Sequence, residues 1–381
     1  MAHSPAGTGR CQSAKSGPAA FTGQPAPLTA SASASAIRWY NFCAMRLSRR
    51  DFLKLTGLAA GGLMLPPVPP DEAPRRVEQL GRAVRGLYIY ARPSFQSEQL
   101  NFLGADSVFN LYGSAPGEDD TPNKVWWRVR RGYVHSAPVQ LVGWELQTPT
   151  LDVPADGFLA EVTVPYTQSR VGPGAGYKFG YRFYYGTTHW VARAIVDDEG
   201  GVWYGILGDR TRAYHWAPGE HLRRVTAEEL APLSPEVRDK RIEVSLEGQT
   251  LKCFEGDRLV LEAACSTGVP LRRENGRVIY GTPVGEWQVI RKRASRHMAG
   301  DDLAADDFFD LPGVPWVTYI HWWGVAIHGT YWHNDFGRPR SHGCINLPNE
   351  TAKWIYRWTT PSVPPERQEL EARGTAVRVD Y

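Results

Sequence analysis

The sequence predicts a mainly β protein with two or three domains. Its 381 residues exceed the length of one ordinary domain. The 38 glycines and 29 prolines favour short strands and turns over long helices. Stretches in which apolar and polar residues alternate recur along the chain, as expected for strands with one buried face.

The charge of the chain is concentrated at its N-terminus. Residues 1–70 hold seven of the Lys and Arg residues and one acid, Asp51. The remainder carries 36 basic and 39 acidic side chains, although the whole chain has a net charge of +3. A nucleic-acid-binding domain needs a concentration of basic residues, so we expect no nucleic-acid partner.

Residues 45–70 resemble a twin-arginine export signal. Residues 48–54 have the sequence S-R-R-D-F-L-K, and the apolar run that follows, Leu55–Leu65, is too short to span a bilayer. An ordinary amphipathic helix is the alternative. We interpret residues 1–44 as disordered or as a misplaced start. The resemblance implies export to the cell envelope, the periplasm or the extracellular wall, with an uncleaved leader acting as an anchor.

The next segment predicts a short helix or linker followed by a small β domain. Residues 71–86 are charged with scattered apolar positions, which is typical of a linker or short helix. Residues 126–135 alternate in period two up to a glycine turn, as in a strand pair. The W-x-x-V and G-Y-V patterns of residues 87–148 resemble a bacterial SH3-like barrel.

A second β segment of similar style covers residues 149–232. Asp197–Gly201 is predicted to form the turn between strands Val191–Val196 and Val202–Leu207. Two SH3-like barrels or one continuous β domain are both compatible with this pattern. The aromatic residues of both β segments are expected in the core, and the alternative, which the resemblance to SH3-like domains implies, is contact with wall glycan or peptide.

The last part of the chain also begins with strand patterns. Arg241–Leu246, Gln249–Phe254 and Arg258–Ala264 are predicted strands, and Thr375–Val379 is a predicted final strand. Arg291–Pro315 is long and heavily charged, and is interpreted as a solvated loop or a lid. The strands carry Cys253 and Cys265, which are expected to be buried apolar residues rather than a disulfide.

The strongest chemical signal lies between residues 327 and 347. Cys344 is preceded by His342 and Gly343, and His328 lies sixteen residues upstream. A cysteine is nucleophilic as the thiolate, and a free thiol with a pKa of about 8.5 is mostly protonated at neutral pH. A nearby imidazole can take that proton. The pattern therefore predicts a Cys–His nucleophilic site.

This stretch resembles the signature of the L,D-transpeptidase catalytic domain, the YkuD family. The matching residues are His328–Gly329 and Ser341–Asn346, which read H-G and S-H-G-C-I-N. The S-T-G of residues 266–268 and the T-P-V-G of residues 282–285 resemble the same family. The resemblance covers residues 238–381 and implies a β-sandwich or barrel catalytic domain.

The resemblance also implies the roles of the site residues. Cys344 is the expected nucleophile and His328 the expected general base, with the Gly329 carbonyl orienting its ring. The N–H of Gly343 is expected to face a developing oxyanion. His342 is expected to shape the pocket or to donate a proton. The substrate-binding residues that we expect, with loop fixing, surface charge or core packing as their alternatives, are Ser341, Arg340, Arg338, Asn346, Tyr319 and Trp323.

The implied reaction needs no cofactor and no metal. The thiolate would attack a peptidoglycan tetrapeptide stem, release its terminal D-Ala and pass the acyl group to a neighbouring side-chain amine, which gives a 3→3 cross-link. Carbapenem-type β-lactams are the implied covalent inhibitors. Release of the acyl group by water, as in an L,D-carboxypeptidase, is the alternative within this enzyme class.

Three other classes fit the sequence less well. The spacing H-x4-H-x8-H-x-C of His328, His333, His342 and Cys344 differs from common zinc patterns. Papain-like proteases place the cysteine before the histidine, whereas this chain has the reverse order. A non-catalytic wall-binding protein would not need the intact His–Cys signature.

Overall fold

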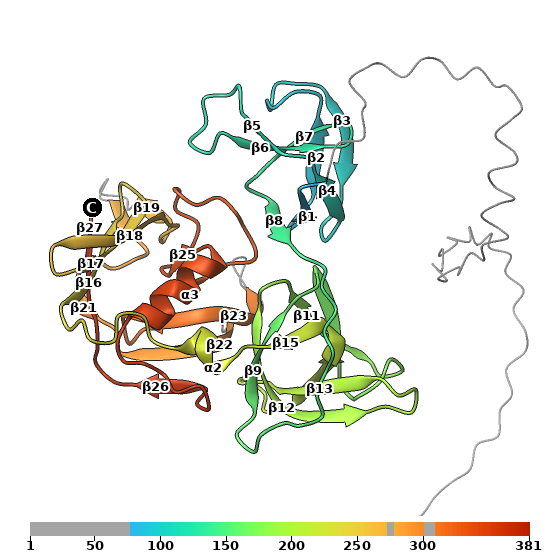
Figure 1. Cartoon of the computed structure of the whole chain (residues 1–381). Coiled ribbons are helices and arrows are strands. Elements are labelled where there is room, and N and C mark those ends of the chain that lie inside the picture. The colour runs from blue at the N-terminus through green and yellow to red at the C-terminus, as the bar shows by residue number, and fades with distance from the viewer. Residues whose placement is uncertain (1–76, 273–277, 301–308) are drawn as a thin grey trace, which may run out of the picture. The chain divides into compact units, whose positions relative to one another are not determined.

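The computed structural model describes residues 77–272, 278–300 and 309–381 (Figure 1). The predicted start, the export signal and residues 71–76 of the predicted linker lie outside these residues. The described part is mainly β, as predicted, with a single helix of ten residues, α3, as its longest helix. No helix in these ranges is long and apolar enough to cross a membrane.

The first β domain covers residues 79–142 and has two small sheets. One has the order β4-β1-β8 and the other the order β3-β2-β7-β6-β5. The strands are β1 (Gln79–Ala83), β2 (Leu87–Tyr90), β3 (Gln99–Leu103), β4 (Val108–Leu111), β5 (Ser114–Pro116), β6 (Val125–Val129), β7 (Gly132–His135) and β8 (Val139–Val142). Ala83, Leu111 and Val139 are fully buried in their shared core.

Strand β1 differs from the predicted linker or helix at residues 71–86. It pairs with β4 on one side and β8 on the other, so Leu80 lies opposite both Asn110 and Val142. The segment has little strand propensity of its own. Pairing with strands far away in sequence therefore decides its conformation.

The second β domain covers residues 158–224 and is one seven-stranded sheet that shares no strand with the first. Its order is β11-β10-β14-β13-β12-β9-β15. The strands are β9 (Phe158–Val162), β10 (Tyr166–Arg170), β11 (Phe179–Tyr184), β12 (Thr188–Val196), β13 (Val202–Leu207), β14 (Tyr214–Pro218) and β15 (Leu222–Arg224). β12 and β13 form the predicted hairpin, and the Asp197 carboxylate accepts the N–H groups of Glu199 and Gly201 in its turn.

The C-terminal part contains two five-stranded sheets around one helix. Their orders are β18-β17-β16-β27-β21 and β25-β24-β23-β22-β26, and β19 pairs with β20. The elements are β16 (Lys240–Ser245), β17 (Thr250–Glu255), β18 (Arg258–Ala264), β19 (Pro270–Arg272), β20 (Val278–Tyr280), β21 (Gly285–Gln288), β22 (Arg291–Ala299), β23 (Asp310–Tyr319), β24 (Ala326–Gly329), β25 (Ile345–Leu347), α3 (Asn349–Trp358), β26 (Glu369–Glu371) and β27 (Ala376–Asp380).

Helix α3 and both sheets share one core. Ile242 on β16, Ile327 on β24 and Ile355 on α3 are all fully buried in it. Cys253 and Cys265 are free thiols buried in the same core, so the expectation of buried apolar cysteines is met in the structure. Because α3 begins directly after β25, this core also fixes the strand that follows Cys344.

The segment predicted as a solvated loop or lid is instead a long hairpin. β22 and β23 pair from Arg291 opposite Tyr319 to Ala299 opposite Asp310. The inward positions of β22 include Lys292 and Ala294, and the outward charges conceal this alternation in the sequence. Residues 301–308, which carry most of the predicted acidic charge, lie outside the described residues.

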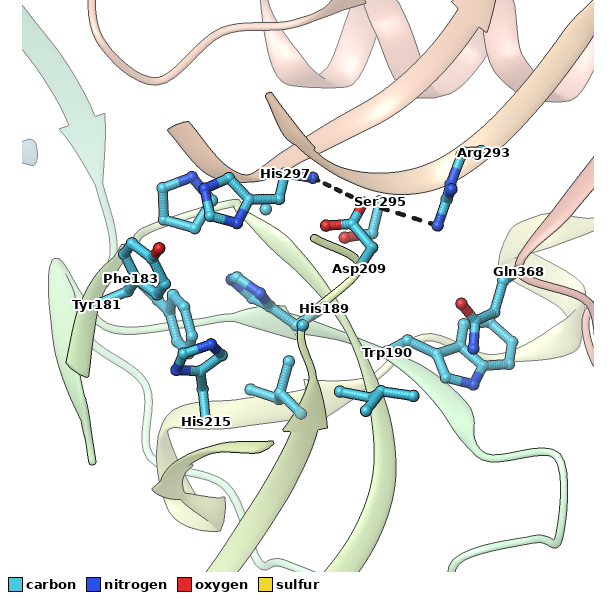
Figure 2. A pocket seen from close by; sticks show the side chains of 15 residues that line it. Tyr181, Phe183, His189, Trp190, Asp209, His215, Arg293, Ser295, His297 and Gln368 are labelled. Atoms are coloured by element: carbon cyan, nitrogen blue, oxygen red, sulfur yellow. Dashed lines mark hydrogen bonds and ion pairs between the residues drawn. The ribbon is translucent and has the colours of Figure 1, made fainter. Parts of the chain in front are cut away.

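Asp209 fastens this hairpin to the second β domain (Figure 2). Its Oδ2 accepts hydrogen bonds from Arg296 Nη1 at 2.8 Å and from the backbone N–H of His297 at 3.1 Å, and it pairs with Arg293 at 3.7 Å. Ser295 and Ala294 also exchange hydrogen bonds with Thr188. The hairpin that borders the candidate site is therefore held from outside its own domain.

Candidate active site

The parallel pairing of β24 with β25 brings His328 and Cys344 to one pocket. His328 lies opposite Asn346 in the register, and Cys344 lies two residues before Asn346. The pocket has a volume of about 540 Å³ and is lined by Met298, Phe309, Leu311, Trp323, Gly324, Val325, His328, Trp332, Arg340, Ser341, His342, Gly343, Cys344 and Asn346.

His328 is held as a neutral imidazole. Its side chain is buried, and Nδ1 lies 2.9 Å from the carbonyl oxygen of Gly329, to which it donates. Burial lowers the pKa of His328 to about 4, although the bond to Gly329 acts in the opposite direction. Since Nδ1 carries the proton, Nε2 of the neutral ring has the free lone pair. His328 can therefore accept a proton at neutral pH.

Cys344 rests as a neutral thiol. Burial raises its pKa to about 11, and a backbone hydrogen bond from Ala326 offsets part of that rise. The thiol donates to the carbonyl oxygen of Gly324 at a distance of 3.7 Å. Since the neutral form is favoured at pH 7, nucleophilic attack by this sulfur requires a base.

Ser341 fixes the loop that carries the cysteine. Its hydroxyl donates to the Cys344 carbonyl at 2.5 Å and accepts the N–H of Gly343 at 3.1 Å. The predicted oxyanion donor is thus already engaged, and an oxyanion would have to replace Ser341 as its acceptor. Gly343 has φ of +149°, and an added Cβ would lie 2.9 Å from the Gly281 carbonyl oxygen. A larger residue at this position would displace the loop.

Thr282 belongs to the site, but the sequence analysis assigned no role to it. Its buried hydroxyl donates to the Gly343 carbonyl at 2.8 Å and accepts the N–H of Gly268 at 2.8 Å. It therefore ties the T-P-V-G step and the S-T-G step to the cysteine loop. The motifs indicated the family, but only their contact in space shows this link.

The predicted substrate-binding residues separate into two groups. Trp323, which is 66% exposed, and Arg340 line the pocket. Tyr319 does not, because it points into a small core with Val314 and lies beneath Arg291. Arg338 is exposed and also lies outside the pocket lining. Tyr319 and Arg338 thus lie outside the pocket lining, and their predicted contact with substrate stays a prediction.

Arg340 is already paired. Its Nε donates to Asp335 Oδ2 at 2.7 Å, and its terminal nitrogen contacts the same oxygen. The Asp335 side chain is 3% exposed, so this ion pair neutralises a buried carboxylate. The guanidinium is not free to act only as an anchor for a substrate carboxylate.

Comparison with known proteins finds a family match for the C-terminal part of the chain. Residues 239–379 match the model of the YkuD family, described as the L,D-transpeptidase catalytic domain. This region is a YkuD L,D-transpeptidase catalytic domain. The resemblance predicted from the H-G and S-H-G-C-I-N signature is therefore confirmed.

The relatives of the YkuD domain are distant. A Bacillus licheniformis protein named as L,D-transpeptidase YkuD is 28% identical over 141 residues, which cover 35% of this chain and 70% of the relative. An Enterococcus faecium L,D-transpeptidase crystal structure is 26% identical, with a TM-score of 0.29, and covers 38% of this chain. This chain spans about half of that protein, 51%. A Mycobacterium smegmatis L,D-transpeptidase is 18% identical, with a TM-score of 0.30, and covers 49% of this chain and 79% of its own.

His333 and Asn346 connect the YkuD pocket to the loop before Cys344. The Nδ2 of Asn346 and the Nε2 of His333 are 3.1 Å apart, and His333 Nδ1 accepts the backbone N–H of Asp335. Asn346 therefore has a contact that fixes the loop, the alternative to substrate binding given for it above, and His333 is its partner. Within residues 77–272, 278–300 and 309–381, no group of three or more His, Cys, Asp or Glu side chains is arranged to hold a metal ion.

Proposed function

We propose that this protein is a cysteine-dependent L,D-transpeptidase that acts on peptidoglycan stem peptides. The proposal rests on one observation above all. A neutral imidazole, His328, and a protonated thiol, Cys344, line the same pocket of a YkuD catalytic domain. An acyl transfer that begins with proton transfer from sulfur to nitrogen needs these two groups in these protonation states.

Acylation transfers the acyl group of the donor to Cys344. His328 Nε2 takes the thiol proton while Sγ forms a bond to the carbonyl carbon of the donor amide, and the carbonyl π electrons move to oxygen. When the oxyanion collapses, the C–N bond breaks. The leaving amine takes the proton from His328. The product is a thioester at Cys344 and a free D-amino acid.

The deacylation step reverses these roles. The side-chain amine of a second stem attacks the thioester carbonyl and loses a proton to His328, and Cys344 leaves with that proton. The product is an amide, the 3→3 cross-link. Gly343 N–H, once it turns from Ser341 towards the oxyanion, would stabilise both tetrahedral intermediates.

The pocket walls support transfer to an amine. Met298, Leu311 and Trp332 are among its apolar lining residues. Apolar walls reduce access of water to the thioester and so favour aminolysis over hydrolysis. Carbapenem-type β-lactams, which present a strained amide, are proposed to acylate the same thiol.

The location of the substrate is consistent with the predicted export signal. We propose that residues 45–70 direct the protein through the twin-arginine route to the cell envelope, where peptidoglycan is found. We also propose that the two β domains contact wall glycan.

Intact-mass measurement after incubation with a stem tetrapeptide tests the proposal. The expected adduct equals the donor minus its leaving residue, and added stem acceptor should convert it to a cross-linked dimer. Cys344→Ala and Cys344→Ser should retain the fold and form no adduct. His328→Ala should form the adduct much more slowly.

Three results would contradict parts of this proposal. An adduct on Cys344→Ala would remove the nucleophile assignment. Release of free acid without dimer in the presence of acceptor would indicate an L,D-carboxypeptidase. Binding to sacculi with no adduct in the wild-type protein would indicate a non-catalytic wall-binding protein.

A further inference from the structure

Arg82, in the first β domain, is a buried charge whose contacts lead towards the active site. The residue is 2% exposed. Its Nη1 donates to Asp106, and its Nε and Nη2 donate to Gln140 Oε1 at 3.0 and 2.7 Å. Nη2 also donates to the backbone carbonyl of Tyr331 at 2.9 Å. A buried guanidinium is retained only when such partners offset the loss of hydration.

Tyr331 belongs to the loop that separates the two catalytic candidates. This loop, residues 330–341, follows β24 and His328 and ends just before Cys344. The structure shows no regular helix or strand in it. An irregular loop keeps one conformation only through contacts with its surroundings.

The first β domain supplies two further contacts to this loop. The backbone N–H of Asn334 donates to the Ala137 carbonyl at 2.9 Å. Asn123 Nδ2 donates to Asp335 Oδ1 at 3.3 Å. Together with Arg82, these contacts hold the loop at Tyr331, Asn334 and Asp335.

The same loop touches the pocket residues. The Trp332 ring lies 5.8 Å from the ring of His328, and His333 meets Asn346, the register partner of His328. Asp335 pairs with Arg340, just before the S-H-G-C motif. A displacement of Tyr331 or Asp335 would therefore reach both the expected base and the nucleophile loop.

We propose that Arg82 and Asn123 are positioning residues of the active site, and that the first β domain completes the catalytic site in cis. Both residues lie outside the pocket lining and touch none of the reacting atoms. They act through residues 331–335, which set the placement of His328 and Cys344. The inference rests on the proposed function only for the measurement that uses a stem peptide as the acyl donor; the alkylation measurement does not depend on it.

The contacts of Asp106 provide a matched control. Asp106 pairs with Arg82 and also with Arg182 from the second β domain. Arg182 has no contact with residues 331–335 among the described hydrogen bonds and ion pairs. Arg182→Met thus removes one cationic partner of Asp106, whereas Arg82→Lys keeps a cation there and removes the guanidinium fork that reaches Gln140 and Tyr331.

The experiment measures two rates in the full-length chain. The first is alkylation of Cys344 by iodoacetamide from pH 6 to 10, corrected by the Cys344→Ala variant for other thiols. The second is acyl-enzyme formation from the stem tetrapeptide, with kcat and KM determined separately. The proteins are wild type, Arg82→Lys, Asn123→Ala and Arg182→Met, each with its unfolding midpoint.

We expect Arg82→Lys and Asn123→Ala to lower kcat about tenfold or more with little change in KM, because misplacement of reacting groups by about 1 Å can cost about a hundredfold. Their alkylation profiles should shift from the wild-type profile, and Arg182→Met should behave as wild type. If Arg82→Lys does not fold, Asn123→Ala decides by the same criteria.

Two outcomes would overturn the inference. In the first, Arg82→Lys and Asn123→Ala both have rates within twofold of wild type and unshifted alkylation profiles. The other is an equal loss in Arg182→Met, which would show a general effect of the domain interface. If the wild-type protein forms no acyl-enzyme at all, the proposed function fails, while the alkylation profiles still decide the positioning role.

Discussion

The thiol of Cys344 donates a hydrogen bond to the carbonyl oxygen of Gly324, with a distance of 3.7 Å between sulfur and oxygen. Gly324 lies in the turn between β23 and β24, next to the exposed Trp323 at the pocket edge. The resting partner of the thiol proton is therefore a backbone carbonyl. Attack by sulfur requires the proton to leave this partner for Nε2 of His328, so the resting protonation states of the two groups determine how the reaction depends on pH.

The pH dependence of Cys344 alkylation should show the resting protonation states of Cys344 and His328. Burial raises the pKa of Cys344 to about 11 and lowers that of His328 to about 4. Between pH 6 and 10 the thiol is then mostly protonated and the imidazole neutral. The alkylation rate should rise about tenfold per pH unit across this range, because the thiolate fraction does so below the pKa.

A plateau of the alkylation rate above pH 6 would contradict this expectation. It would indicate a thiolate–imidazolium pair already formed in the free enzyme. Stopped-flow measurement with iodoacetamide distinguishes the two profiles, and His328→Ala provides the control. If His328 is the base, this variant should react more slowly near neutral pH, and an unchanged rate would count against that role.

Thr282 should be required for the shape of the cysteine loop. Thr282→Val keeps the volume but removes the hydroxyl between the Gly268 N–H and the Gly343 carbonyl. Two buried backbone groups would lose their partner, at about 1–3 kcal/mol each in the free energy of unfolding. We expect a lower unfolding midpoint and slower acylation of Cys344, whereas Thr282→Ser should keep both near wild type.

Calorimetry and the acylation rate of the two variants test this role. Equal behaviour of Thr282→Val and wild type would show that the hydroxyl does not hold the loop. A loss in Thr282→Ser as large as in Thr282→Val would assign the effect to the methyl group.

The sequence predicted the two reacting residues of the site better than the residues that hold them in place. His328 and Cys344 belong to a signature with fixed spacing, so a local pattern is enough to find them. Thr282 and Asp335 act through contacts with residues distant in sequence, and no local pattern predicts those contacts. Arg340 was expected to meet a substrate or to be a surface charge, and its pairing with Asp335 appears only because the fold buries that carboxylate.

The fold shows the same division. The hairpin of residues 191–207 has a turn signal and clear alternation, and its local sequence predicts it. Strand β1 exists because β4 and β8 flank it, which is a property of tertiary structure. In the β22–β23 hairpin, charged residues at the outward positions hide the alternation of buried and exposed residues from sequence analysis. These charges meet partners such as Asp209 only in the folded chain.

The Arg340–Asp335 pair should stabilise the fold in a pH-dependent way. Burial alone would raise the pKa of Asp335, but the hydrogen bond and charge of Arg340 outweigh it, and the pKa lies below its usual value. A carboxyl with a lowered folded pKa contributes stability above its unfolded pKa, about 3.9. That contribution is lost as the pH falls through the folded pKa.

Arg340→Met should therefore be destabilising at pH 7, by about 2 kcal/mol, because a buried carboxylate loses its charged partner. The difference from wild type should shrink as the pH falls towards the lowered pKa of Asp335 in wild type, because Asp335 takes up its proton at a higher pH in the variant, where Arg340 no longer offsets burial. Arg338→Met is the comparison variant, because this exposed arginine lowers the pKa of Asp335 through its charge, as the last of the causes, and should therefore lose less stability at pH 7 than Arg340→Met. Urea unfolding at pH 3, 5 and 7 gives the three free energies of unfolding. A pH-independent difference, or a loss of donor binding with unchanged stability, would return Arg340 to the role of substrate anchor.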